Sequence, residues 1–371
     1  SPELRARSRR VIAGLIALTS FAAATTAMVA VDRLWPAWAG LGQSLPGARV
    51  AVVQADFGAS DGTLERAREA LPRDELVQVT VTTDRVPRLG DSSSARADAL
   101  RVIFSIADQL GARGCAMLEP DVTNVTPDRV ARLLGPLESD QADFVTPSYA
   151  RHRFTGAVTT SIVYPYVRAL YGKRLRYPVG GEFACSSRLL QRFLAADIWR
   201  TEAARLGIDV GIAIQALTGS FRLTQVLLAE KSQLANDGLD LAGTLSQVLG
   251  ALFGETERTM SVWQKVRGSE PVPVRHANGV LGGMPPGPVN RTRSLDAFRL
   301  GAHNLQEVWS PVISPMAQLE LQKLARLPDE RFRFPDSLWA RTVYDFALAY
   351  HLRVMNREHL LSAFTPLYAG W

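Results

Sequence analysis

The segment ARVAVVQAD, residues 48–56, decides the fold, because a short apolar run ends there in an acid and a turn. Such a run, bounded by turn residues, is typical of a buried strand. Strands of this kind are predicted at residues 11–18, 48–54, 76–82 and 116–118, and helices after residue 18, near residue 64, at 93–110 and from 127. Strands that alternate with helices predict an α/β fold with a mostly parallel, doubly wound sheet.

The composition is that of a globular protein with a large core, since 47% of the 371 residues are hydrophobic and 21% are charged. It excludes wholesale disorder, a disulfide scaffold and a collagen-like rod. The formal charge of +6 is dispersed and indicates anionic ligands, without a nucleic acid partner. Cys115 and Cys185 belong to no CxxC pair, so we expect a reducing, cytoplasmic compartment.

Acids follow two of the predicted strands. Asp56 ends the strand at 48–54, while Glu119 and Asp121 follow the strand at 116–118. Ligands of doubly wound sheets bind beyond the carboxyl ends of the strands. Asp56 could accept from a nucleobase N–H, and the other two acids could bind Mg²⁺ through hard oxygen ligands. The alternative is that all three lie in solvated turns.

Two further turns carry acceptor side chains. Gly180 and Gly181 would let the backbone approach a ligand closely, and Glu182 could accept from a sugar hydroxyl. Asp209 opens a later apolar run and offers a second acceptor, although it could also cap a helix. The chain contains no HExxH, P-loop or GxSxG motif, which excludes metalloprotease, P-loop and α/β-hydrolase functions.

The order of these motifs extends over nearly the whole chain. The segments that carry it are residues 54–63, 95–101, 118–122, 149–152, 161–165, 169–174, 180–183, 207–210, 268–271, 334–336, 344–347 and 365–368. In this order and spacing the chain resembles the retaining GT-A nucleotide-sugar glycosyltransferases related to glucosylglycerate and mannosylglycerate synthases. The resemblance implies a GT-A, Rossmann-like sheet flanked by helices and followed by a mainly helical C-terminal part.

The resemblance also implies roles for single residues. Asp209 and Glu182 would be the catalytic acids. The implied binding residues are Asp56, Arg96, Gly180 and Gly181 for the donor, Arg151 and Thr159 for the acceptor carboxylate, and Glu119, Asp121 and Gln233 for Mg²⁺ or Mn²⁺. The implied reaction moves a hexose from a UDP- or GDP-sugar to D-glycerate or a similar small hydroxy acid.

Four features depart from the family pattern. One is the first loop, where the family has a polar Pro-Ser-Tyr-Asn-Asn type sequence and this chain has Ile16 to Ser20. Glu119 replaces the first Asp of the DxD metal motif, and Arg96 stands in Ala-Arg-Ala where the family has Gly-Lys-Gly. Gln233 replaces the histidine of a Gly-x-Lys-x-His run. Two hypotheses therefore remain. The chain is an active glycosyltransferase, or it is a degenerate paralogue that binds a ligand or a partner subunit without efficient transfer.

The stretch from Val11 to Val31 has two interpretations. It holds 21 residues without a charge and follows four arginines, which is typical of a membrane span or a signal peptide. Its many Ala, Ser and Thr residues would make membrane insertion marginal. In the family that the chain resembles, this place holds the first strand and helix of the sheet. We therefore expect no membrane segment here.

The proline-rich stretch from Glu270 to Pro288 and the change to helical patterns give the expected domains. Residues 1–238 would form the nucleotide-sugar-binding and catalytic domain. Residues 239–371 would form a mainly helical region on the acceptor side or for oligomerisation, and a homodimer is expected from its apolar helices.

Overall fold

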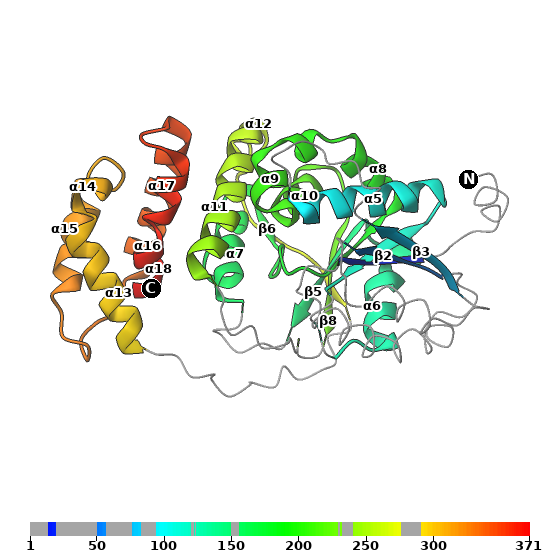
Figure 1. Ribbon diagram of the computed structural model, residues 1–371, viewed down its shortest axis with the longest axis horizontal. Helices are drawn as coiled ribbons and strands as arrows, with labels where there is room; N and C mark the ends of the chain where they lie inside the picture. The colour runs from blue at the N-terminus through cyan, green and yellow to red at the C-terminus, as the bar shows by residue number, and fades with distance from the viewer. Residues whose placement is uncertain are drawn as a thin grey trace. The chain divides into compact units, whose positions relative to one another are not determined.

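The computed structural model describes residues 14–19, 50–56, 76–82, 94–119, 122, 124–149, 156–228, 231, 240–275 and 291–371 (Figure 1). The chain forms two compact units. Unit 1 consists of residues 1–236 and 261–285, and unit 2 of residues 237–260 and 286–371. The expected domains, residues 1–238 and 239–371, stay a prediction, and unit 1 also includes the segment 261–285. Two short strands of that segment pair with strands of unit 1.

The described part of unit 1 contains an eight-stranded sheet with the order β10-β8-β5-β7-β4-β1-β2-β3. Its strands are β1 (Gly14–Thr19), β2 (Val50–Asp56), β3 (Leu76–Thr82), β4 (Gly114–Leu118), β5 (Phe144–Tyr149), β7 (Phe183–Ser186), β8 (Leu223–Leu228) and β10 (Val274–Arg275). β7 runs antiparallel to both β4 and β5, and the other pairings in this sheet are parallel. The predicted mostly parallel α/β sheet is confirmed.

Helices pack on both faces of this sheet (Figure 1). The described helices of unit 1 before β8 are α5 (Ala95–Gln109), α6 (Pro127–Glu138), the π-helix η2 (Thr159–Val163), α7 (Tyr164–Tyr171), α8 (Ser187–Ala195), the 3₁₀ helix η3 (Asp197–Arg200), α9 (Glu202–Leu206) and α10 (Ile208–Thr218). Of these, α5, α6 and α8 pack directly on the sheet. Ser94 and Thr126 cap α5 and α6 by accepting from backbone N–H groups in the first turn. α10 is apolar and buried on nearly all sides, so it belongs to the core of unit 1.

The regular elements in the described part of unit 2 are all helices, and they pack around aromatic side chains. Its helices are α11 (Leu241–Arg258), α13 (Arg291–Asn304), α14 (Gln306–Trp309), α15 (Pro315–Ala325), α16 (Asp336–Leu352), α17 (Arg357–Ser362) and α18 (Thr365–Gly370), while α12 (Met260–Trp263) begins at the unit boundary. Trp339 stacks on Trp371 with ring centroids 5.2 Å apart, and Phe364 packs between Trp339 and Phe346. The predicted helical C-terminal part is confirmed.

The uncharged stretch from Val11 to Val31 is described only over β1, which lies between β2 and β4. That segment is the first strand that the sequence predicts. The helices predicted after residue 18 and near residue 64 lie outside the described residues. Among the helices that are described, none combines the length and the apolarity needed to cross a membrane.

One buried carboxylate joins the amino ends of β5 and β8 to the carboxyl end of the antiparallel strand β7. Asp143 precedes β5 and accepts from Arg188 Nη2 at 2.7 Å, from the backbone N–H of Arg222 at 2.9 Å and from Ser186 Oγ at 3.0 Å. Burial alone would raise the pKa of Asp143, but the hydrogen bonds from Arg188 and Arg222 outweigh it and hold this pKa well below its usual range. Asp143 therefore fastens β5, β7 and β8 to one another at this edge.

Candidate functional site

Polar side chains from several elements of unit 1 meet at the opposite, carboxyl edge of the sheet. Glu119 follows β4, Tyr149 ends β5, and Lys231 follows β8. Because β7 is antiparallel to its neighbours, Glu182 at its start lies at the same edge. This edge is where doubly wound sheets bind their ligands.

Lys231 binds the carboxylate that was expected to hold a metal. Its Nζ donates to Glu119 Oε2 and, at 2.9 Å, to the backbone carbonyl of Gly180. The Lys231 side chain is only 2% exposed, whereas the Glu119 side chain is 22% exposed. Nζ also lies 5.9 Å from the ring centroid of Tyr149, within reach of a cation–π interaction. A buried ammonium group thus neutralises Glu119.

Gly181 makes the close approach that its sequence context predicts. Its φ of +78° lies in the left-handed region that favours glycine. A Cβ at this position would overlap the carboxylate of Glu119. The backbone of Gly181 on one side and Lys231 on the other therefore confine this carboxylate.

Glu182 belongs to a fully buried network. Arg129 Nη2 donates to Glu182 Oε2 at 2.6 Å, and Tyr149 Oη donates to the same oxygen. Burial alone would lower the pKa of Arg129, but the charge of Glu182 and the hydrogen bond to it raise this pKa overall. The guanidinium also lies 5.3 Å from the Tyr149 ring centroid. These contacts hold the chain entering β7 against the end of β5 and the first turns of α6.

Arg96 forms a bidentate ion pair with Asp209. The sequence predicts a donor-binding role for Arg96 and a catalytic role for Asp209. Arg96 Nε lies 2.6 Å from Oδ2 and Nη2 lies 2.7 Å from Oδ1. Nη2 also donates to the backbone carbonyl of Gly181 at 3.4 Å. Both side chains are partly exposed, at 17% and 18%. Asp209 stands in the first turn of α10, where the helix dipole stabilises a negative charge.

The other predicted residues divide into those that the structure describes and those that it does not. Thr159 Oγ1 donates to the carbonyl of Val179 at 3.1 Å, so it supports the turn that leads to Gly180. Asp56 ends β2, and only its backbone is described. The residues outside the described ranges are Asp121, Arg151 and Gln233. The roles given to all of these residues stay predictions.

The described residues of this edge do not fit a divalent cation. Mg²⁺ and Mn²⁺ prefer carboxylate oxygens and water, but Glu119 accepts from an ammonium group and Glu182 and Asp209 from guanidinium groups. In the part of the chain that the structure describes, no three His, Cys, Asp or Glu side chains gather in a way that could hold a metal ion.

Sequence reasoning missed Arg129 and Lys231. Arg129 has no signal in the sequence, because an arginine in the first turn of a helix is usually solvated, yet its side chain is 4% exposed. Lys231 had one signal. It is the Lys of the Gly-x-Lys-x-His pattern, whose histidine position is the one expected to bind a metal ion.

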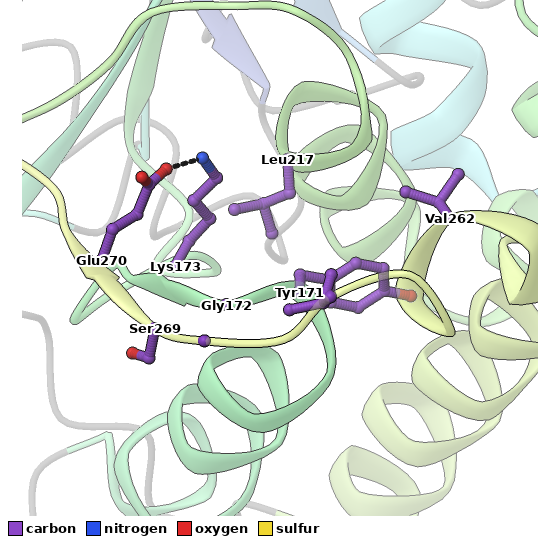
Figure 2. Close-up of a pocket in the computed structure, with 9 residues that line it drawn as sticks. Tyr171, Gly172, Lys173, Leu217, Val262, Ser269 and Glu270 are labelled. Atoms are coloured by element: carbon purple, nitrogen blue, oxygen red, sulfur yellow. Dashed lines mark hydrogen bonds and ion pairs between the residues drawn. The ribbon is translucent and has the colours of Figure 1, made fainter.

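Apart from this edge, a hollow of unit 1 lies beside the two-stranded sheet of β6 (Lys173–Arg174) and β9 (Glu270–Pro271). It has a volume of about 460 Å³. Figure 2 shows Lys173 and Glu270 pointing toward one another and forming an ion pair. Arg174 Nη2 donates to the carbonyl of Ser269 at 3.1 Å. Lys173 and Arg174 thus hold the segment 269–271.

No known protein family matches the chain, and no curated protein does. Its structure is similar to that of glucosyl-3-phosphoglycerate synthase from Mycobacterium tuberculosis in complex with Mg²⁺ and UDP, with a TM-score of 0.47 and 19% identity over 68% of this chain and 83% of that chain. Mannosyl-3-phosphoglycerate synthase from Rubrobacter xylanophilus has a TM-score of 0.47 and 19% identity over 72% and 82%. The names agree in kind with the resemblance seen in the sequence, and they assign no role to any residue of this chain.

Proposed function

We propose that the chain is a retaining glycosyltransferase that moves a hexose from a nucleoside diphosphate sugar to a small hydroxy acid. The observation that carries the proposal is the arrangement around Gly180 and Gly181. Two of the acids that the motif order assigns to the reaction, Glu182 and Asp209, flank this glycine pair at the ligand-binding edge of the sheet. Each acid is held by an arginine, so both are fixed before a substrate arrives.

Asp209 is the acid suited to contact a substrate. A carboxylate offers about four acceptor positions, and Arg96 uses two of them. The others can accept from a sugar or acceptor hydroxyl, since the side chain is partly exposed. Glu182, by contrast, is fully buried and accepts from Arg129 and Tyr149. We assign it a positioning role, in which it holds the glycine pair in place.

The cations of this edge would stabilise the leaving group. When the bond between the sugar and the diphosphate breaks, negative charge grows on the diphosphate oxygens, and fixed positive groups lower that barrier. Arg96 and Lys231 lie on either side of the glycine pair and donate to its two backbone carbonyls. In a front-face reaction the leaving diphosphate would take the proton of the acceptor hydroxyl, so the chain needs no nucleophile of its own. Its contribution is positioning and charge.

The second hypothesis, a degenerate paralogue, is favoured by one specific observation. All three described acids of the edge are already paired with cations of the same chain. A protein that has lost transfer could keep such pairs for stability alone. This version would bind a nucleotide or a partner subunit and would not release product.

Calorimetry with UDP- and GDP-hexoses, followed by mass spectrometry of products, separates these hypotheses. D-glycerate is one acceptor, and 3-phosphoglycerate is the other, because the solved structures are named for it. Binding with product formation supports the proposal. Binding of a nucleotide sugar without any product favours the degenerate paralogue, and no binding of any nucleotide sugar would overturn the proposed function.

We also infer a cytoplasmic protein that forms a homodimer. Cys115 and Cys185 face each other on β4 and β7 and are free thiols, as a reducing compartment would keep them. Unit 2 exposes large apolar side chains on its helices, among them Leu300, Met316 and Leu348. Sedimentation equilibrium tests the dimer, and a concentration-independent monomer mass would contradict it.

A further inference from the structure

The Lys231 ammonium group pairs with Glu119, the first acid of the motif that is expected to hold a metal ion. The Lys231 ammonium group is nearly inaccessible to solvent and donates to Glu119 and to the Gly180 carbonyl. Burying a lysine is costly unless its charge is paired and its N–H groups are bonded. At the carboxyl edge of the sheet, beside the glycine pair, Glu119 and the Gly180 carbonyl provide that pairing for Lys231.

The Glu119 carboxylate has little freedom to leave this ammonium group. A Cβ on Gly181 would overlap the carboxylate, which shows how closely the backbone approaches it. Turning toward a metal ion would require Glu119 to leave its cation and would leave Lys231 buried without its anion. The loss of a partner in a buried pair is strongly unfavourable.

The charges of the described side chains at this edge also disfavour a metal ion. The described acids Glu119, Glu182 and Asp209 pair one to one with Lys231, Arg129 and Arg96. A divalent cation prefers a site with a negative excess, and among the described residues of this edge these pairs leave none. An anion such as a diphosphate is suited to the cations instead, because Lys and Arg remain charged and keep N–H donors for phosphate oxygens.

We propose that the Lys231 ammonium replaces the divalent cation, so that this chain binds a nucleoside diphosphate without a metal ion. An ammonium group has three N–H donors, and the structure shows acceptors from the protein for two of them, Glu119 and Gly180. The third is directed to a diphosphate oxygen in the bound state. This inference rests on the proposed function, since it takes the donor's diphosphate as the ligand.

The test is calorimetry of the full chain with UDP and with GDP, in EDTA and in Mg²⁺. The expected result is that one nucleotide binds, with affinities in the two buffers that agree within about threefold, well under the tenfold change that 1.4 kcal/mol produces. Binding that appears only with Mg²⁺ would overturn the inference and leave the proposed function standing. Failure of both nucleotides to bind in either buffer would overturn both.

The variant Lys231→Met sharpens the test. In EDTA its nucleotide affinity should fall by about 10- to 100-fold, as expected for a lost charge-assisted contact. Mg²⁺ should then restore part of the affinity, because the freed Glu119 carboxylate can bind the ion. If Lys231→Met binds the nucleotide in EDTA as tightly as the parent chain does, the inference is wrong.

Two further variants serve as controls. Lys173→Met removes an amine of the same kind from the exposed pair with Glu270 (Figure 2) and should leave nucleotide affinity unchanged. Lys231→Arg keeps the charge and should keep metal-independent binding. Thermal unfolding shows whether Lys231→Met is folded. If Lys231→Met is not folded, the nucleotide affinity of Lys231→Arg in EDTA and in Mg²⁺ tests the inference instead. A gain of Mg²⁺ dependence in Lys231→Arg would contradict the inference.

Discussion

The two edges of the sheet in unit 1 each hold a buried carboxylate, and they use it differently. At the amino edge, Asp143 accepts from a backbone N–H and from side chains that adjoin the ends of β7 and β8. At the carboxyl edge, Glu182 accepts from the side chains of Arg129 and Tyr149, next to a pair of glycines. At the amino edge, Arg188 and Arg222 converge on Asp143, and Arg222 also pairs with Asp140. At the carboxyl edge, three separate acids each pair with a different cation around the glycine pair, and this arrangement marks that edge as the candidate site.

The largest loss of stability is expected from Arg129→Met at the carboxyl edge. This variant leaves the Glu182 carboxylate buried without its cation, which costs about 3–5 kcal/mol. Urea denaturation measures the free energy of unfolding. The double variant Arg129→Met with Glu182→Gln should recover much of the loss, because both charges are then gone. A cost near that of a surface ion pair would show that the network is not desolvated.

The next largest loss is expected from Asp143→Asn at the amino edge. It removes charge-assisted hydrogen bonds to two arginines and should cost about 2 kcal/mol. Nucleotide affinity, measured by calorimetry, should stay at the parent value, because this residue lies at the edge away from the candidate site. A fall in affinity comparable to that of Lys231→Met would mean that the two edges are coupled.

The difference in unfolding free energy between the parent chain and Asp143→Asn should depend on pH. The pKa of Asp143 is lowered in the folded state, so its contribution is complete above the unfolded pKa of about 3.9. It is lost as the pH falls through the lower, folded pKa. The stability difference between parent and Asp143→Asn should therefore be constant from neutral pH to about pH 5 and shrink below about pH 4. If the stability difference already shrinks near pH 6, a group other than Asp143 causes its pH dependence.

Asp209→Asn should have little effect on folding and a large effect on the reaction. Its ion pair with Arg96 is partly exposed, so the variant should cost at most about 1 kcal/mol in unfolding free energy. Turnover should fall by about 10²-fold, as for loss of one preorganised polar group in an active site. The measurement is kcat with nucleotide affinity determined in parallel. Unchanged turnover would show that Asp209 is not the acid that takes part in the reaction.

The smallest effect is expected from Lys173→Met, outside both edges. The hydrogen bond and charge of Lys173 lower the pKa of Glu270. Removing the amine should return that pKa toward its ordinary value, which an NMR titration of the Glu270 carboxyl would detect. The unfolding transition should not move measurably. A clear loss of stability would show that β6 and β9 contribute more to unit 1 than an exposed pair does.

Much of the described sheet could be predicted from the sequence, because apolar runs bounded by turns identify buried strands. The strand predicted at 76–82 has those bounds in the structure, and the helix predicted from residue 127 begins there. The reversed direction of β7 could not be predicted. Its four residues form an apolar run too short to have a period, and a run of apolar residues carries no information about direction.

At the candidate site, the sequence likewise identifies single residues but not the partners that they contact. Glu182 and Asp209 were found because they stand beside glycines in turns, where side chains reach ligands. Their partners Arg129 and Arg96 could not be assigned, since which arginine meets which acid depends on contacts 53 and 113 residues apart along the chain. Lys231 was visible in a quoted motif, but only the structure shows that its ammonium group meets Glu119.

The glycine pair has a consequence for loop length. Gly180 and Gly181 are adjacent, and their carbonyls accept from Lys231 and Arg96 respectively. One dipeptide, whose Cα atoms are about 3.8 Å apart across a trans peptide bond, therefore sets the separation between two positive groups that arrive from distant parts of the sequence. Inserting a single residue between the glycines would change that separation, even if the inserted residue were itself a glycine. Among relatives of this chain, the length of this turn should vary less than its flanking residues do.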